Sequence, residues 1–451
     1  MEKFLIGKCV DYTYDGKGIV KKDNKVVFVD GVIIDEEVEV EIIFESKNQT
    51  IGKLLKIIKP SPYRIKPFCN LAKDCGGCAL QHIVYDKQLE FKTKHVQDCI
   101  QKFSKLDIKV NKCIGMEKPF KYRNKSQVPF TLEKKEIKYG FYKQNTHKIV
   151  QMDECDIQTE DADSILKTIK ILMKRHRISP YEEDKRKGTL RHVLIKKGFS
   201  TNQIMVVLVT NTNTFPGRKD FVKDLIKEHP QIKTVVQNIN TRDTNVILGE
   251  KEIVLFGSGY IEDILLGVKF KISSKSFYQV NPTQTEVLYS KAIDMANLSK
   301  NDRVLDAYCG IGTIGLIVSK RVNEVIGVEI VRDAIKDAKC NASINNISNA
   351  HFVLADASDF MVDLAKTSEK MDVVFVDPPR KGCDENFLNA LMKLSPKKIV
   401  YISCNPSTLA RDLYSLKEKY NIEEIQPVDM FPHTYHVETI ASLTLKHWEK
   451  A

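Results

Sequence analysis

A carboxylate and a thiol follow two apolar segments in the last fifth of the sequence. Residues 373–376 (VVFV) precede Asp377, and residues 399–403 (IVYIS) precede Cys404. Both segments have the length and composition of buried strands. Because ligands bind at the carboxyl ends of the strands in an open α/β sheet, we expect Asp377 and Cys404 to lie together at a reactive edge.

A glycine-rich turn lies upstream, between an expected strand and an expected helix. Gly310, Gly312 and Gly315 form the pattern G-x-G-x-x-G within residues 304–320 (VLDAYCGIGTIGLIVSK). Such glycines let the backbone approach a ligand closely. Glu329 ends the next strand 19 positions after Gly310, where an acidic side chain can hold ribose hydroxyls. The pattern predicts a cofactor that contains a nucleoside.

The charges near this turn distinguish two classes of cofactor. A carboxylate at the end of the first strand, Asp306, would repel the pyrophosphate of a dinucleotide but would attract a cation. S-adenosylmethionine carries an amine and a sulfonium, so we favour it as the cofactor. Asp356, after the third strand, is expected near the adenine. The alternative is a sheet with tight turns and no cofactor.

The residues after the prolines indicate the atom that is modified. Asp377-Pro-Pro is similar to the loop of amino-group methyltransferases, but those enzymes need an aromatic residue next, and this chain has Arg380. A ring carbon such as C5 of uracil is then the expected target. Because C5 is a poor nucleophile, a Cys404 thiolate would first add to C6. Glu438, within residues 433–439 (HTYHVET), is the candidate base for the C5 proton.

Each of these residues also has a purely structural interpretation. A single cysteine at a strand end is more often a small core residue, and a single glutamate is more often a surface residue. The catalytic interpretation depends on finding Cys404 and Glu438 beside Asp377 and the cofactor strands.

Four other cysteines have the spacing of a thiolate site. Cys69, Cys75 and Cys78 lie close together in the sequence, and Cys155 is more distant. The candidate occupants are a [4Fe–4S] cluster and a structural zinc ion. Zinc sites more often contain two Cys-x-x-Cys pairs, and this segment has one, which favours iron–sulfur. Four unrelated reduced thiols are the remaining alternative.

Three regions are expected along the chain. Residues 1–60 contain five short strand-like segments, which predicts an OB-like β-barrel that binds nucleic acid or serves as a protein-contact module. Residues 61–265 are expected to form an α+β central domain with the cysteine site and an RNA-binding surface. A helix near residues 85–105 can pack on the catalytic domain. Residues 266–451 alternate strands and helices, which predicts a Rossmann-like, doubly wound sheet.

The bulk composition limits the class of protein. The 451 residues carry a formal net charge of +11, which is compatible with a nucleic-acid partner. The sequence has no apolar run of membrane-spanning length and no signal peptide at its start, so we expect a cytoplasmic protein with no membrane partner. The odd number of cysteines, 11, favours metal or catalytic roles over disulfides.

Six segments, in this order, resemble the RNA (uracil-5-)-methyltransferase family. They are FYQVNP (277–282), DAYCGIGTIGL (306–316), GVE (327–329), DPPRKGC (377–383), SCNPSTLARDL (403–413) and HVE (436–438). Residues 67–82 (PFCNLAKDCGGCALQH), together with Cys155, are similar to the members that hold a [4Fe–4S] cluster. Residues 1–60 look like the TRAM domain of the family.

The resemblance implies roles for particular residues. It implies that S-adenosylmethionine is the methyl donor, that Cys404 is the nucleophile and that Glu438 is the proton acceptor. It also implies cofactor contacts at Gln279, Tyr308, Glu329 and Asp377, in addition to the contact expected at Gly310 of the glycine-rich turn, and cluster ligands at Cys69, Cys75, Cys78 and Cys155.

The resemblance also predicts the substrate. Members with a TRAM domain and a cluster act mostly on 23S rRNA, whereas the tRNA enzymes of the family typically lack both. We therefore expect a monomeric enzyme that flips a uridine of 23S rRNA out of its stack. A tRNA substrate, a non-catalytic RNA-binding or ribosome-assembly factor, and an oxidoreductase that uses the cluster are the alternatives.

Overall fold

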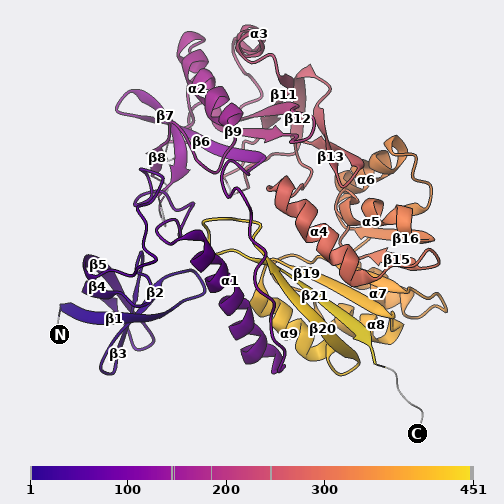
Figure 1. Ribbon diagram of the computed structural model, residues 1–451. Helices are drawn as coiled ribbons and strands as arrows, with labels where there is room; N and C mark the ends of the chain where they lie inside the picture. The colour runs from indigo at the N-terminus through magenta and orange to yellow at the C-terminus, as the bar shows by residue number, and fades with distance from the viewer. Residues whose placement is uncertain (1–2, 144–145, 147, 184, 244–245, 447–451) are drawn as a thin grey trace.

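A closed barrel and two seven-stranded sheets dominate the computed structural model, which describes residues 3–143, 146, 148–183, 185–243 and 246–446 (Figure 1). A two-stranded hairpin separates the two large sheets in the sequence. Within the described residues, no helix combines the length and the apolar composition that a membrane span requires. The multidomain α/β class expected from the sequence is confirmed.

The N-terminal strands close into a barrel with the order β1-β2-β3-β5-β4. The strands are β1 Phe4–Tyr12, β2 Gly18–Lys22, β3 Lys25–Val29, β4 Glu37–Glu45 and β5 Thr50–Lys59. Small apolar side chains such as Val20, Val27 and Val38 fill the interior. Gly52 is required where β5 approaches β4, since a Cβ there would lie 2.2 Å from Cγ1 of Val40. The predicted small β-barrel is confirmed.

The second sheet has the order β12-β11-β10-β9-β6-β7-β8. Its strands are β6 Lys125–Glu133, β7 Glu136–Tyr142, β8 Ile149–Gln151, β9 Leu190–Lys197, β10 Ile204–Thr210, β11 Ile232–Ile239 and β12 Lys251–Gly257. Its helices are α2 Glu160–Arg175 and α3 Arg218–Glu228. In β10, Val206 and Leu208 face the core under these helices, whereas Met205 and Val207 face a core shared with the C-terminal part. This sheet is therefore apolar on both faces.

The C-terminal sheet has the order β17-β16-β15-β18-β19-β21-β20. Its strands are β15 Arg303–Asp306, β16 Glu324–Glu329, β17 Ala350–Leu354, β18 Val373–Val376, β19 Lys398–Ser403, β20 Tyr420–Val428 and β21 Glu438–Leu445. The first five are parallel, whereas β21 pairs antiparallel with both β19 and β20. The predicted Rossmann-like sheet is confirmed, with two added antiparallel strands.

Helices and a hairpin surround this sheet. They are the hairpin strands β13 Tyr260–Leu265 and β14 Val268–Ser273, and the helices α4 Pro282–Ala296, α5 Thr313–Val318, α6 Arg332–Ile344, α7 Ala357–Leu364, α8 Glu385–Leu394 and α9 Pro406–Leu416, with the short 3₁₀ helix η2 Ser319–Arg321 after α5.

One helix from the first quarter of the chain also packs against this sheet. α1 Tyr85–Cys99 continues into the π-helical turn η1 Ile100–Ser104, and both contact α9 or β20 (Figure 1). Val96, Cys99 and Ile100 belong to the same buried cluster as Leu409 of α9. A segment that is distant in sequence thus forms part of the core beside the reactive edge.

Candidate active site

The predicted carboxylate and thiol lie at one edge of the C-terminal sheet. Asp377 directly follows β18 and Cys404 directly follows β19, and these parallel strands pair Val376 with Tyr401. Parallel strands present their carboxyl ends at the same edge, so Asp377 and Cys404 follow neighbouring strands there, with Cys404 two residues beyond the position level with Asp377. The sequence expectation for their placement is met.

Glu438 reaches the same edge from the opposite direction. It is the first residue of β21, which pairs antiparallel with β19 so that Ser403 lies opposite Thr439. Extending this register by one residue sets Cys404 beside Glu438, and directly opposed residues have Cα atoms about 4.5–5.5 Å apart. Glu438 is only 4% exposed, whereas Cys404 is partly accessible. A buried carboxyl thus adjoins an accessible thiol.

The charges at this edge influence one another. Burial raises the pKa of Cys404 to about 11, with Glu438 and Asp377 adding to the effect and Arg380 opposing it. Burial, with a smaller effect of Asp377, holds the pKa of Glu438 well above its usual range, again opposed by Arg380. Burial also raises the pKa of Asp377 to about 7. These four side chains therefore form a single electrostatic site.

The start of α9 supports the thiol. Cys404 precedes the N-cap residue Asn405, whose Oδ1 accepts a hydrogen bond from the Ser407 N–H at 3.1 Å, and Pro406 takes the first helical position. The partial positive charge of a helix N-terminus favours a thiolate. The Asn405 Nδ2 group also donates to the Arg380 carbonyl at 3.0 Å, which fastens the loop after β18 to this helix.

A buried aspartate holds the other end of that loop. Asp412 of α9 is fully buried and its Oδ2 accepts from the Cys383 N–H at 2.9 Å and from the Tyr401 hydroxyl at 2.6 Å. Gly382 has φ +75°, and a Cβ there would lie 2.7 Å from that same Oδ2. The loop from Asp377 to Cys383 is therefore fixed against the helix that follows Cys404.

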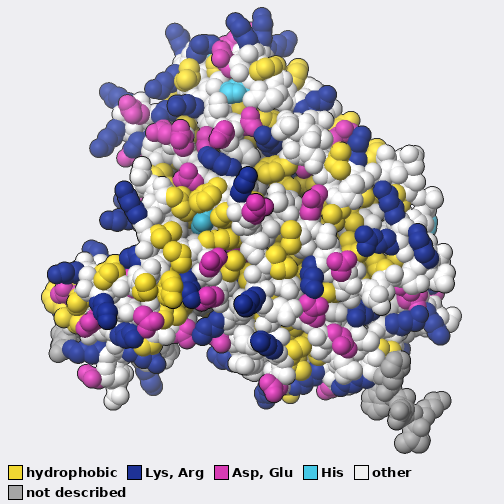
Figure 2. Space-filling model, viewed as in Figure 1, with side chains coloured by type: hydrophobic (Ala, Val, Ile, Leu, Met, Phe, Trp, Pro, Cys, Tyr) yellow, Lys and Arg dark blue, Asp and Glu magenta, His cyan; other side chains and the backbone are white. Residues whose placement is uncertain are grey.

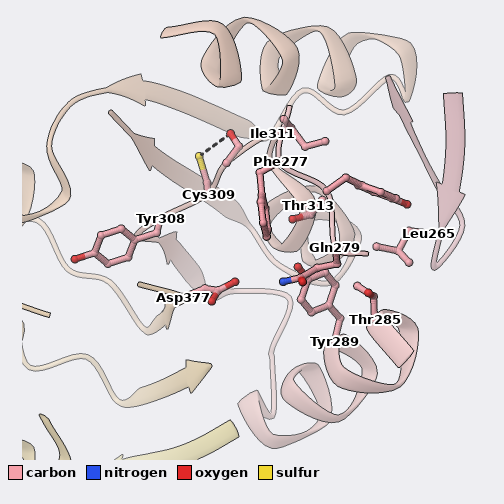
Figure 3. A pocket seen from close by; sticks show the side chains of 12 residues that line it. Leu265, Phe277, Gln279, Thr285, Tyr289, Tyr308, Cys309, Ile311, Thr313 and Asp377 are labelled. Carbon is pink, nitrogen blue, oxygen red and sulfur yellow. Dashed lines mark hydrogen bonds between the residues drawn. The ribbon is translucent and has the colours of Figure 1, made fainter. Parts of the chain in front are cut away.

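A pocket opens beside Asp377 (Figure 3). It is lined by Leu265, Phe277, Tyr278, Gln279, Thr285, Tyr289, Tyr308, Cys309, Gly310, Ile311, Thr313 and Asp377. Four of the six residues predicted to contact the cofactor are among them, namely Gln279, Tyr308, Gly310 and Asp377. The side chains of Asp377 and Gln279 face each other in Figure 3. The pocket thus combines aromatic walls, a glycine turn and one carboxylate.

The other two predicted cofactor residues lie outside this lining. Glu329 accepts from the Gly310 N–H through Oε2 at 3.2 Å and from the Val331 N–H through Oε1 at 2.8 Å, so it fixes the glycine turn. Asp356 is exposed and caps α7, accepting from the Ser358 N–H at 2.8 Å. Both carboxylates therefore have a local structural role.

Asp306 does not face this pocket, contrary to the expectation that its carboxylate would attract a cationic cofactor. Asp306 is 1% exposed and does not line the pocket, and its Oδ2 accepts from the Gly315 N–H at 2.9 Å inside the glycine turn. Its Oδ1 has no hydrogen-bond partner among the residues that the structure describes. Burial raises the pKa of Asp306 to about 7. The carboxylate that faces the pocket is Asp377.

Sequence reasoning missed part of the pocket. Thr285 and Tyr289 come from α4, and Thr313 begins α5. The helical segment after residue 282 was expected, but only its amphipathic spacing could have indicated which of its side chains face inward.

The four cysteines of the predicted cluster site converge. Burial raises the pKa of the Cys78 thiol, and the charges of Cys155, Cys75 and Cys69 raise it further, so these three thiols lie within electrostatic range of Cys78. Among the described residues, no group of three or more His, Cys, Asp or Glu side chains has the geometry of a metal-ion site. A donor set made only of thiols is soft and suits an iron–sulfur cluster better than a hard cation. The residues present are compatible with such a group.

A family model described as tRNA (Uracil-5-)-methyltransferase matches residues 84–446. The chain belongs to this family. A Clostridium acetobutylicum protein described as an uncharacterized RNA methyltransferase is 48% identical over 434 residues, covering 95% of this chain and 94% of that protein. A Bacillus cereus protein of the same description is 45% identical over 437 residues, covering 96% and 95%.

A solved structure agrees with this membership. The crystal structure of Pyrococcus abyssi tRNA (uracil-54, C5)-methyltransferase in complex with S-adenosyl-L-homocysteine matches with a TM-score of 0.81 and 29% identity, covering 98% of this chain and 100% of that one. The protein is an S-adenosylmethionine-dependent RNA (uracil-C5)-methyltransferase. The predicted enzyme class and methyl donor are confirmed.

The raised pKa of Cys404 predicts slow alkylation in the free enzyme. At pH 8, iodoacetamide is expected to modify Cys404 about tenfold more slowly than an ordinary exposed cysteine, because the smaller thiolate fraction outweighs its higher nucleophilicity. The rate should rise with pH as the thiol ionises. Peptide mapping by mass spectrometry would separate Cys404 from the other cysteines. Arg380→Gln should slow the alkylation of Cys404 further, whereas Arg380→Lys, which keeps the positive charge, should not. Faster alkylation of Cys404 than of a free cysteine would contradict the prediction.

Proposed function

We propose that the enzyme methylates C5 of a uridine in 23S rRNA, with Cys404 as the nucleophile and Glu438 as the base. The observation that carries this proposal is the register between β19 and β21, which sets the two side chains next to each other beside the pocket that contains Asp377. A thiol, a buried carboxyl and a cofactor pocket at one edge are the groups that this reaction requires.

Two residues of this chain carry the covalent steps. The Cys404 thiolate forms a bond to C6 of the uracil, and the electron pair of the C5=C6 bond moves onto C5 and O4 as an enolate. C5 then takes the methyl group that S-adenosylmethionine supplies, and the electron pair of the broken methyl–sulfur bond stays on sulfur, leaving S-adenosylhomocysteine. Glu438 accepts the C5 proton, the C–H electron pair restores the C5=C6 bond, and the C6–S bond breaks to return Cys404 as a thiolate.

The electrostatics of the edge suit these roles. Arg380 and the N-terminus of α9 oppose in part the burial that raises the pKa of Cys404. A high pKa makes Glu438 a strong proton acceptor once it is ionised. Because the target base must reach both a buried carboxyl and the cofactor pocket, the uridine has to leave its stack.

The pocket supports the proposed cofactor contacts. Gln279, Tyr308 and Gly310 line it and supply an amide, an aromatic ring and a close backbone approach. The Asp377 carboxylate would favour the cationic end of S-adenosylmethionine. Glu329 has further acceptor capacity for a ribose hydroxyl beside the turn that it fixes, and Asp356 lies after β17 on the side where the adenine is expected.

The four converging thiols support a [4Fe–4S] cluster held by Cys69, Cys75, Cys78 and Cys155. The methyl transfer needs no electron donor or acceptor, so we assign the cluster a structural role. It would tie Cys155 to the segment that carries the other three ligands.

Two classes of RNA are candidate substrates, 23S rRNA and tRNA. The barrel and the cysteine segment resemble those of family members that act on 23S rRNA, which supports our proposal. The Pyrococcus abyssi enzyme acts on tRNA according to its description and matches 98% of this chain, so the overall architecture does not separate the two substrates. Lys and Arg side chains are prominent along the rim of the part formed by α2 and α3, and on the barrel they are interspersed with acidic and hydrophobic side chains (Figure 2); the basic side chains suit contacts with the phosphates of either RNA.

Separate variants test the two catalytic roles. Cys404→Ala should abolish methylation, whereas Glu438→Gln should form the C6 bond and transfer the methyl group but fail to release the product. A methylated RNA–protein adduct that survives denaturing electrophoresis is the expected result for Glu438→Gln. Normal release by Glu438→Gln would show that another group removes the proton, and methylation by Cys404→Ala would refute the covalent mechanism.

Metal analysis tests the cluster. Protein purified without oxygen should contain about four iron atoms per chain, and Cys155→Ser should lower that content. Cys340→Ser is a matched control, because Cys340 is a free and partly exposed cysteine outside this site. Stoichiometric zinc without iron would favour the structural zinc alternative.

Mapping of 5-methyluridine identifies the substrate. In cells that lack the gene, mass spectrometry of rRNA and tRNA should show loss of the modification at one or two 23S rRNA positions. Loss that is confined to tRNA would keep the chemistry and replace the proposed substrate by the second candidate.

A further inference from the structure

The loop that leads to Glu438 has no regular secondary structure. It consists of residues 429–437 and joins β20 to β21. His433 lies within it with φ +68°, a conformation that non-glycine residues rarely adopt, and this residue is only 4% exposed. Contacts from elsewhere must hold such a segment in place.

A buried ion pair from α1 holds the start of this loop. Lys92 Nζ donates to Asp429 Oδ1 at 2.5 Å and to the Phe431 carbonyl at 3.1 Å. Both side chains of the pair are 0% exposed. The Tyr85 hydroxyl, also from α1, donates to Asp429 Oδ2 at 2.8 Å. Both oxygens of the loop carboxylate are therefore bound by one helix.

A second contact from α1 holds the middle of the loop. Gln88 Oε1 accepts from the His433 N–H at 3.1 Å, and Gln88 Nε2 lies 3.3 Å from His433 Nδ1. The other ring nitrogen, Nε2, lies 2.9 Å from the Pro119 carbonyl. Since that carbonyl can only accept, Nε2 carries the proton and Nδ1 accepts from Gln88. Gln88 is 1% exposed, so this pairing is shielded from water.

The cysteine-bearing segment contacts the same histidine. The Leu80 N–H donates to the His433 carbonyl at 2.9 Å. The Phe68 ring, one residue before Cys69, lies 4.7 Å from the His433 ring. Residues outside the catalytic sheet thus bind the loop from Asp429 to His433. Asn281, the N-cap residue of α4, also binds near the start of the loop: its Nδ2 donates to the Met430 carbonyl at 3.1 Å.

We infer that Gln88 and Lys92 are positioning residues for Glu438, so that α1 sets the geometry of the proton removal that releases the product. This inference rests on the proposed function of Glu438 as the base. The step concerned breaks the C5–H bond, passes the proton to Glu438 and expels the Cys404 thiolate from C6. Bond formation by Cys404 depends on β19 and the start of α9, and among the described residues the side chains of Gln88 and Lys92 form no hydrogen bond to either element, so the two steps should respond differently to a change at these two residues.

A pair of matched variants separates this role from general stability. Gln88→Leu removes both hydrogen bonds to His433 and the bond that Gln88 Nε2 donates to the Ile83 carbonyl at 2.9 Å. Gln97→Leu removes two side-chain bonds from the same helix, to the Ile108 carbonyl at 3.1 Å and from the Val110 N–H at 2.8 Å, neither of which touches the loop. Each full-length protein is incubated with radiolabelled S-adenosylmethionine and an RNA that carries the mapped uridine. Adduct and released 5-methyluridine are quantified over time and across pH.

Gln88→Leu is expected to release product at least tenfold more slowly than the wild type while forming adduct at a similar rate, so methylated adduct accumulates. The affinity for S-adenosylmethionine should be unchanged, and the pH profile of release should shift because the surroundings of Glu438 change. For Gln97→Leu, the ratio of adduct to released product should equal that of the wild type. Equal losses of adduct formation and release in Gln88→Leu, or wild-type partitioning, would overturn the inference.

A second variant covers the case in which Gln88→Leu does not fold. The double variant Lys92→Met with Asp429→Asn removes the ion pair without leaving one buried charge unpaired, and the same accumulation of adduct is expected. Glu438→Gln is measured alongside. If Glu438→Gln accumulates adduct and neither α1 variant does, the inference alone fails; if Glu438→Gln releases product normally, the proposed base is wrong and the inference falls with it.

Discussion

The site depends on strands of opposite direction meeting at one edge of a single sheet. β18 and β19 are parallel, so their carboxyl ends bring Asp377 and Cys404 together. β21 lies between β19 and β20 and runs the other way, so its first residue, Glu438, reaches the same edge. In a wholly parallel sheet the first residue of a strand would lie at the far edge, away from the thiol. The antiparallel addition therefore supplies a group that the basic fold could not.

Burial gives this edge its electrostatic character. It raises the pKa values of Asp306 and Asp377 to about 7 and that of Glu438 well above its usual range. Several ionised carboxylates in one apolar region are costly unless a positive charge accompanies them. A cationic methyl donor would favour ionisation of Asp377 and, through it, would alter the proton affinity of its neighbours. If Glu438 is the base, as proposed, cofactor binding and the ionisation of that base would be linked by charge.

The local sequence predicted candidate functional residues where they lie at the end of a strand. Cys404 and Glu438 could be proposed because short apolar runs mark the strands that carry them. Asp306 was misjudged, because the sequence does not reveal whether a carboxylate faces a ligand or bonds its own turn. The capping role of Asp356 has a recognisable helix-start pattern, but the pattern does not show distance from the pocket. The task of Lys92 could not be predicted, since its partner Asp429 is 337 residues away.

These long separations in sequence affect the order in which parts of the protein fold. Gln88 and His433 are 345 residues apart, and α1 leaves the ribosome well before β21 is synthesised. Contacts between such distant segments close late, because a long stretch of chain must be ordered before they contribute. The thiol and the glycine turn can therefore be in place while the loop before Glu438 is still unformed. The arrangement around Glu438 is therefore complete only after the first and last quarters of the chain have met.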